Sequence, residues 1–262
     1  MELDLTGRHA LVCGASQGIG RATAHELALL GATVTALARS EAALADVVAA
    51  LPRPAGQHHG HAVADMGDTE GLRAVVQAIV ASAPVHILIN NSGGPPGGPA
   101  HAASTDAYAD VFRQHLIGGQ VLLTAVLPGM RAAHFGRVVN IISTSVKEPL
   151  ANLGVSNTVR AAVAGWAKTL AGEIAVDGIT VNNVLPGYTR TQRLSGLVEA
   201  TQRSTGKDAG EIERGMLAHV PAGRFGEASE VAAVAAFLCT PASAYVNGVS
   251  IAVDGGRTRA LS

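Results

Sequence analysis

Short apolar segments alternate with longer helical patterns along the whole chain. Near-continuous apolar runs predict buried strands over residues 9–13, 32–37, 61–64, 86–90, 137–142, 179–185 and 249–253. Apolar residues at helical spacing predict helices over residues 18–30, 41–51, 69–82, 105–130, 156–176 and 229–238. We expect Pro128 to end or kink the long helix over 105–130. Apolar strands separated by helices indicate a parallel sheet covered on both faces, so the pattern predicts an α/β fold with one doubly wound, Rossmann-type domain over residues 1–262.

Two long loops follow strands of this predicted sheet. Residues 93–99 consist of glycine and proline only, and residues 187–210 form a polar stretch. Ligands bind beyond the carboxyl ends of the strands in doubly wound sheets, and long loops at that edge are usually functional. We therefore expect a substrate lid at about residues 187–215.

Composition and charge exclude several classes of protein. Hydrophobic residues make up 48% and charged residues 15%, which supports a sizeable core and excludes intrinsic disorder. The net charge of −1 lacks the basic excess of a nucleic-acid surface. The chain shows neither a signal peptide nor the roughly 20 apolar residues of a membrane span, so we expect a soluble, cytoplasmic protein.

The cysteines and a histidine cluster do not predict a disulfide or a metal site. Cys13 and Cys239 both lie in apolar runs and are expected to be buried thiols. His58, His59 and His61 are close in sequence, but no carboxylate or cysteine pattern completes a site around them. We expect no bound metal.

A glycine-rich turn joins the first predicted strand to the first predicted helix. Glycines there allow a tight turn and the close approach of a pyrophosphate, which then faces the positive end of the helix dipole. The candidate cofactor-binding residues of this turn are Gly14, Ser16, Gln17, Gly18, Ile19 and Gly20. A glycine-rich turn without a ligand is the alternative interpretation.

Arg39 follows the second predicted strand, where NAD-binding proteins usually carry an acidic residue. A guanidinium group suits a 2′-phosphate, because it offers several fixed donors and keeps its charge. The hypothesis is therefore that the cofactor is NADP(H) rather than NAD(H). The alternative is an ordinary solvated surface arginine.

The segments in this order resemble the short-chain dehydrogenase/reductase family over almost the whole length. They include Asn90-Asn-Ser-Gly93, Gly136-Arg-Val-Val-Asn-Ile-Ile-Ser143, Ile179-Thr-Val-Asn-Asn-Val-Leu-Pro-Gly187 and Val253-Asp-Gly-Gly256. The resemblance implies that Asp65 contacts adenine and that Thr191 contacts the nicotinamide carboxamide. It also places Asn91, Gly93, Pro186 and Gly187 beside the cofactor.

The catalytic residues depart from the family pattern. The resemblance gives Ser143 the place of the family's catalytic serine. Ser156 stands where the family has a tyrosine, and Arg160 stands where it has a lysine that also binds the ribose of the cofactor. His115 stands for the asparagine of the proton relay. Ser156 and Arg160 lie one helical turn apart and share a face. An aliphatic hydroxyl is a far weaker acid than a phenol, and arginine acts only as a fixed charge.

A different proton relay is therefore required. We hypothesise that His115 supplies the proton, directly or through a water held by Ser143 and Ser156, because an unperturbed imidazole titrates near neutrality. The alternative for His115 is a buried helix residue bonded to backbone, and for Ser143 a strand-end cap. Tyr188 is a second candidate donor, or else it lines the substrate pocket.

The predicted function is that of an NADP(H)-dependent oxidoreductase similar to 3-oxoacyl-carrier-protein reductases, acting on a small carbonyl or alcohol substrate. One alternative is a catalytically silent NADP(H)-binding or sensing protein. A second is a non-redox enzyme resembling the halohydrin dehalogenases, which Arg160 favours but the absent tyrosine does not. The resemblance also implies a homo-oligomer, a tetramer or a dimer, in which Ala161, Ala164 and Gly165 permit close helix contact and Trp166 is partly buried.

Overall fold

A parallel sheet of seven strands forms the centre of the protein. The computed structural model describes residues 1–261, and its strands are β1 (His9–Cys13), β2 (Thr33–Ala38), β3 (Gly60–Val63), β4 (Ile87–Asn90), β5 (Gly136–Ile141), β6 (Ile179–Pro186) and β7 (Ser250–Val253). Their order is β3-β2-β1-β4-β5-β6-β7, and every neighbouring pair is parallel. The predicted doubly wound α/β fold is confirmed.

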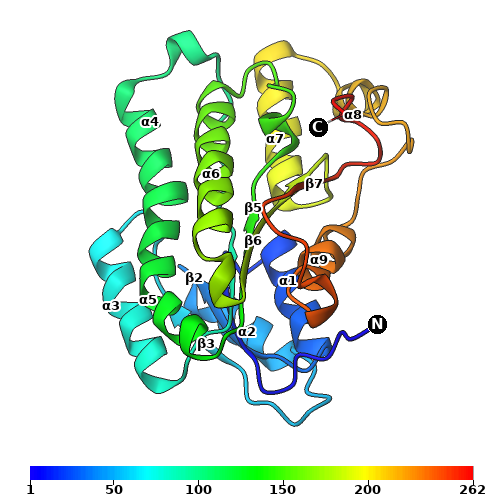
Figure 1. Ribbon diagram of the computed structural model, residues 1–262. Coiled ribbons are helices and arrows are strands. Elements are labelled where there is room, and N and C mark those ends of the chain that lie inside the picture. Colours follow the sequence, from blue (N-terminus) through cyan, green and yellow to red (C-terminus); the bar gives the residue numbers. More distant parts are fainter. Residues whose placement is uncertain (262) are drawn as a thin grey trace.

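Helices cover both faces of this sheet (Figure 1). The helices are α1 (Gly18–Leu29), α2 (Glu41–Ala50), α3 (Thr69–Ser82), α4 (Thr105–Phe112), α5 (Gly118–Ala132), α6 (Gly154–Glu173), α7 (Gln192–Thr205), α8 (Ala209–Leu217) and α9 (Ala228–Phe237). One core cluster joins α1, α2 and α9 to the sheet, and a second joins α3, α5 and α6 to its other face. Successive strand residues point to opposite faces, so Val12 of β1 belongs to the first cluster and Leu11 to the second. Burial on both faces explains why the strands are apolar throughout.

The predicted helix over 105–130 is interrupted. It consists of α4, a π-helical turn at Arg113–Ile117, and α5. Pro128 does not end the helix, which continues for one turn to Ala132. The fully buried Met130 packs this last turn into the core, and that contact offsets the backbone hydrogen bond that proline removes. Other predicted element ends match the structure or differ from it by at most three residues.

The segment predicted as a polar loop contains two helices, α7 and α8, at the top of Figure 1. Thr191 Oγ1 caps the start of α7 by accepting from the amide of Leu194, and Asp208 accepts from the amide of Gly210 at the start of α8. Most residues of α7 are polar, and the helix buries only Val198. That shallow burial explains why the sequence pattern did not predict these helices.

A row of amide hydrogen bonds crosses the carboxyl half of the sheet. Asn90 Nδ2 donates to Asn140 Oδ1 at 2.9 Å, Asn140 Nδ2 donates to Asn183 Oδ1 at 2.9 Å, and Asn183 Nδ2 donates to Ser250 Oγ at 3.0 Å. These side chains are held by four adjacent strands, β4 to β7. The row fixes the relative position of the strand ends that border the site described below.

No helix within residues 1–261 is long and apolar enough to cross a lipid bilayer.

Candidate active site

A cleft of about 640 Å³ opens at the carboxyl edge of the sheet. It reaches from the ends of β1 and β2, past the ends of β4 and β5, to helix α7. Strand order reverses between β1 and β4, which is where doubly wound sheets bind their ligands. The cleft therefore lies where the fold alone predicts a binding site.

The glycine-rich turn forms one wall of the cleft. Gly14 and Gly18 adopt φ values of +60° and +54°, which favour glycine. A Cβ on Gly14 would lie 2.6 Å from Asn91 Nδ2, and a Cβ on Gly20 would collide with the Gly14 carbonyl. Gln17 makes no side-chain cap hydrogen bond, so the first amides of α1 remain available to an anion. The residues of this turn that line the cleft are Gly14, Ser16, Gln17, Gly18 and Ile19, with Gly20 packed behind them.

Arg39 and Asp65 lie together at the β2 end of the cleft. Arg39 Nη1 is 3.8 Å from Asp65 Oδ2, and both residues line the cleft. The Arg39 side chain is 78% exposed, so this ion pair leaves most of its donors free. The guanidinium is therefore available to a phosphate beside the N-terminus of α2.

Asn91 and Thr191 hold the glycine turn from two sides. Asn91 Nδ2 donates to the carbonyls of Cys13 and Gly14, both at 3.3 Å. The Thr191 methyl group lies 3.3 Å from the position of a Cβ on Gly18. Asn91 and Thr191 line the cleft, as do the other residues expected beside the cofactor, Gly93, Pro186 and Gly187.

Ser143 and Ser156 both present hydroxyl groups to the cleft. Ser143 Oγ accepts from the amide of Ser145 at 3.1 Å, and Ser156 Oγ accepts from Arg160 Nε at 3.2 Å. Neither hydroxyl hydrogen has an acceptor among residues 1–261, so each is free to donate into the cleft. Ser143 thus caps the short helix Thr144–Val146 and remains a donor as well.

Arg160 is buried on the wall of the cleft. Its Nη1 donates to the carbonyls of Ile142 at 2.7 Å and Ile141 at 3.2 Å, which fixes the guanidinium at the end of β5. Burial, and then the charge of Arg193, lower the pKa of Arg160 to about 10. The group is still protonated at neutral pH and supplies a fixed positive charge beside Ser156.

His115 lies in the π-helical turn and is 8% exposed. Its Nε2 lies 3.2 Å from the Gly93 carbonyl, and its Nδ1 lies 3.0 Å from Ser92 Oγ. A carbonyl only accepts, so this geometry assigns the proton to Nε2 and leaves Nδ1 to accept from the Ser92 hydroxyl. Burial, and then the charge of Arg160, lower the pKa of His115 to about 3.

The premise that His115 titrates near neutrality is therefore wrong. The ring does not line the cleft and is neutral at neutral pH, whereas Ser92 does line it. Any proton transfer that involves His115 must use the neutral ring and pass through a neighbour such as Ser92. π-helical turns often occur at functional sites, so this placement still associates His115 with the cleft.

Among the cleft residues that sequence reasoning did not single out, three carry polar or charged groups that matter below: Ser92, Arg193 and Arg257. Ser92 lies inside the Asn-Asn-Ser-Gly segment, and Arg193 lies two residues after Thr191. Arg257 follows the Asp-Gly-Gly segment, and its guanidinium lies 4.8 Å from the centre of the Tyr188 ring. Tyr188 itself lines the cleft.

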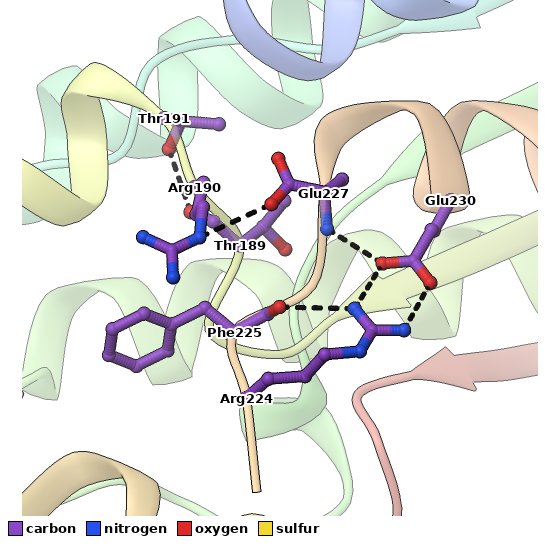
Figure 2. Close-up of polar contacts among 7 residues, drawn as sticks. All are labelled: Thr189, Arg190, Thr191, Arg224, Phe225, Glu227 and Glu230. Carbon is purple, nitrogen blue, oxygen red and sulfur yellow. Dashed lines mark hydrogen bonds and ion pairs between the residues drawn. The ribbon is translucent and has the colours of Figure 1, made fainter. Parts of the chain in front are cut away.

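A polar network holds the start of the lid (Figure 2). Arg224 makes a two-point ion pair with Glu230, with Nη–Oε distances of 2.7 and 2.6 Å, and the amide of Glu227 donates to Glu230 Oε2 at 2.8 Å. Arg190 Nε lies 3.2 Å from Glu227 Oε1. The turn that carries Thr191 is thus tied to the N-terminus of α9.

Comparisons with known proteins agree with this geometry. The sequence model described as "Enoyl-(Acyl carrier protein) reductase" matches residues 14–258. The chain is 33% identical over 257 residues to the 3-oxoacyl-[acyl-carrier-protein] reductase FabG of Vibrio harveyi, covering 97% of this chain and 98% of that protein. It is 34% identical over 257 residues to FabG of Escherichia coli, with the same coverage.

The chain belongs to the short-chain dehydrogenase/reductase family.

Solved structures of other reductases and dehydrogenases have the fold of this short-chain dehydrogenase/reductase. An L-sorbose reductase from Gluconobacter frateurii, complexed with NADPH and L-sorbose, has a TM-score of 0.93 at 28% identity, with full coverage of both chains. A gluconate 5-dehydrogenase from Burkholderia cenocepacia, in complex with NADP and tartrate, has a TM-score of 0.86 at 31% identity, covering 99% of this chain and 98% of that chain. The fold is therefore one that binds NADP in relatives of similar length.

Proposed function

We propose that this protein is an NADP(H)-dependent oxidoreductase that interconverts a carbonyl and an alcohol, similar to the 3-oxoacyl-carrier-protein reductases among its relatives. The observation that carries the proposal is one cleft that combines a phosphate-binding turn, an exposed arginine at the β2 end and two free hydroxyl donors at the end of β5. The close approach of Gly14, Gly20 and Asn91 fits a dinucleotide, because each glycine lies where a side chain would close the turn.

A nicotinamide nucleotide held by the glycine turn and Arg39 would supply or accept the hydride, and the protein's own residues act on the substrate oxygen. In reduction, the carbonyl carbon gains a hydride and its oxygen gains a proton, which yields an alcohol and the oxidised nucleotide. Ser143 and Ser156 donate hydrogen bonds to that oxygen as negative charge develops on it. Arg160 raises the donor strength of Ser156 through its Nε hydrogen bond and adds a fixed positive charge.

In this proposal the proton for the oxygen comes from a water molecule that the Ser143 and Ser156 hydroxyls hold in the cleft, and bulk solvent returns a proton to the hydroxide that remains. Ser92 donates to His115 Nδ1, and the His115 Nε2 proton is bonded to the Gly93 carbonyl, so this pair orders the polar residues beside the cleft and does not itself deliver the proton. General acid–base assistance is worth about 10²–10⁴-fold in rate, so we expect slower turnover than in relatives with tyrosine and lysine. Residues 187–215, including α7, act as the substrate lid of a single domain in this proposal.

Single-turnover hydride transfer tests the function. The protein is loaded with NADPH and mixed with a panel of 3-oxoacyl thioesters, keto acids and ketoses, and NADPH absorbance is followed. We expect oxidation by at least one carbonyl compound and an activity loss of about 10²-fold in Ser143→Ala, because one oxyanion donor contributes about that much. The proposal fails if NADPH binds and no carbonyl compound oxidises it.

The second candidate function is a catalytically silent NADP(H)-binding protein. It is favoured by Arg160, whose guanidinium is fixed by two backbone carbonyls and cannot act as an acid. The double variant Ser156→Tyr with Arg160→Lys separates the two functions. If the wild type shows no turnover and the double variant does, the protein is catalytically silent. Turnover by the wild type indicates an enzyme.

A further inference from the structure

The substrate end of the cleft holds three arginines and no carboxylate. Arg160, Arg193 and Arg257 line it, and the one acidic residue of the lining, Asp65, lies at the other end beside Arg39. None of the ion pairs formed among residues 1–261 includes any of these three arginines. A local excess of positive charge is therefore present in a protein whose net charge is −1.

Arg193 projects from the first turn of the lid helix α7 into the cleft. Its Nη2 donates to the Pro95 carbonyl at 2.5 Å. The guanidinium lies over the glycine–proline loop, within 3.2–3.3 Å of the position of a Cβ on Gly94. This contact holds the charge in place, and the remaining donors of Arg193 have no partner among the described residues.

Arg257 also lines the cleft. It stacks on the Tyr188 ring, and its Nη1 donates weakly to Thr144 Oγ1 at 3.4 Å. Its Nε is buried and has no hydrogen-bond partner among residues 1–261. A planar guanidinium held by stacking is well suited to binding a carboxylate or phosphate at two points.

The anionic groups of the dinucleotide do not account for these charges. In the proposed function the glycine turn binds its pyrophosphate and Arg39 binds a 2′-phosphate, both at the other end of the cleft. Arg193 and Arg160 repel each other, as the effect of Arg193 on the pKa of Arg160 shows, and a bound anion reduces this repulsion. An anionic group on the substrate would supply the missing charge.

We propose that the substrate is an oxo acid whose carboxylate or phosphate is bound by Arg193 and Arg257 while its carbonyl oxygen faces Ser143 and Ser156. This inference rests on the proposed function, because it assumes that the reacting carbonyl lies at the two serines. Arg193 and Arg257 are then specificity-determining residues that select an acid over its neutral analogue. Lid helix α7, which carries Arg193, closes over the anion.

Matched substrates test the proposal. The value of kcat/KM with NADPH is measured for 3-oxobutanoate against its methyl ester, and for dihydroxyacetone phosphate against dihydroxyacetone. We expect the preferred anion to exceed its neutral partner by about 10-fold or more, since hydrogen bonds to charged groups are worth about 1.5–3 kcal/mol. The two pairs distinguish a carboxylate from a phosphate. Equal values for both pairs in the wild type would overturn the proposal.

Substitution of the two arginines tests the assignment. Arg193→Gln and Arg257→Gln should each reduce the preference for the anion about 10-fold, and Arg257→Lys should restore part of it. Arg203→Gln is the matched control, because Arg203 lies on α7 as Arg193 does but is exposed and does not line the cleft. The control should keep the wild-type preference.

A binding experiment separates this inference from the proposed function. Calorimetry measures the affinity of each variant for NADPH. It also compares the affinities of the NADPH-loaded protein for butyrate and for its neutral analogue butyramide. Binding of butyrate that depends on both arginines, with NADPH affinity unchanged, supports the anion subsite even if no carbonyl compound is reduced. The opposite result would be weaker NADPH binding in Arg193→Gln or Arg257→Gln, with butyrate binding unchanged or absent. It would show that these arginines bind the dinucleotide rather than the substrate, and it would overturn the inference.

Discussion

Residue identity decides which nucleotide and which proton chemistry the cleft accommodates. Arg39 is exposed at the end of β2, and its single ion pair leaves its donors accessible. Arg160 and His115 are both buried, and burial is the largest cause of the lowered pKa of each. These two positively chargeable groups therefore have opposite states at neutral pH, because Arg160 is charged and His115 is neutral.

The first prediction concerns Arg39. Arg39→Ala should weaken NADPH binding about 10- to 100-fold, because two or more charge-assisted hydrogen bonds to the 2′-phosphate are lost. NADH binding should change less than about 2-fold. Calorimetric dissociation constants for both nucleotides check this, and equal weakening of the two would show that Arg39 does not select the phosphate.

The second prediction concerns the pH dependence of stability at His115. The folded pKa of about 3 lies below the ordinary value of 6.5, so the unfolded chain binds a proton that the folded protein does not. The contribution of this residue is present above pH 6.5 and is lost as the pH falls toward 3. The loss amounts to at most about 1.4 kcal/mol of unfolding free energy for each pH unit.

Urea unfolding between pH 7 and pH 4 measures this effect. His115→Asn should lose less stability on acidification than the wild type, because asparagine does not titrate. His101→Asn, at an exposed position, should follow the wild type. Parallel curves for the wild type and His115→Asn would contradict a strongly lowered pKa.

At the scale of elements, turns and caps position the reactive groups. The glycine turn and Asn91 join β1, α1 and β4 at the point where strand order reverses. The network of Arg190, Arg224, Glu227 and Glu230 joins the lid turn to α9 (Figure 2). Both connections link elements that are far apart in sequence, so the site is formed only when the sheet and helices are assembled.

The third prediction concerns this turn. Gly20→Ala should abolish measurable NADPH binding, because the added Cβ would meet the Gly14 carbonyl and Asn91 Nδ2 and push the turn open. Gly172→Ala in α6 is the matched control, since nothing lies within 4 Å of a Cβ there, and alanine favours a helix. Circular dichroism and calorimetry check both variants. Normal nucleotide affinity in a folded Gly20→Ala protein would exclude the turn from the binding site.

At the scale of the whole molecule, one exposed helical face is suited to contact with a second copy. Ala161 and Gly165 are exposed on α6, next to the partly buried Trp166, whose Nε1 donates to Gln120 Oε1 at 2.9 Å. Phe112 and Ile117, at the end of α4 and in the turn after it, are 40% and 38% exposed. Small residues beside exposed apolar ones allow helices to approach closely.

The fourth prediction is a homo-oligomer, a dimer or a tetramer, formed through this face. Sedimentation at micromolar concentration should give at least twice the monomer mass. Gly165→Glu should shift the protein toward the monomer, because a buried charge at a close contact is costly, and Gly196→Glu on α7 should not. A monomeric wild type would refute the prediction.

Much of this protein could be predicted from local sequence signals. Apolar runs and helical spacing determined the sheet and the helices that cover it, because burial on both faces leaves a strong pattern. The glycine turn and Arg39 could be predicted as site residues from their positions next to strands, and Ser143 from the resemblance to the family. Local signals failed for α7 and α8, because the segment that contains them is largely polar and the two helices bury only Val198 and Ile212.

Only the tertiary structure decided the electrostatic state of the site. The sequence placed His115 on a helix, but its neutrality depends on burial beside Arg160, which is 45 positions away. Likewise, Arg193 and Arg257 are unremarkable in the sequence, and their charge becomes significant because folding brings them into one cleft without a carboxylate. Local pattern determines which faces are buried, whereas pKa values and charge clusters depend on distances that only the folded chain defines.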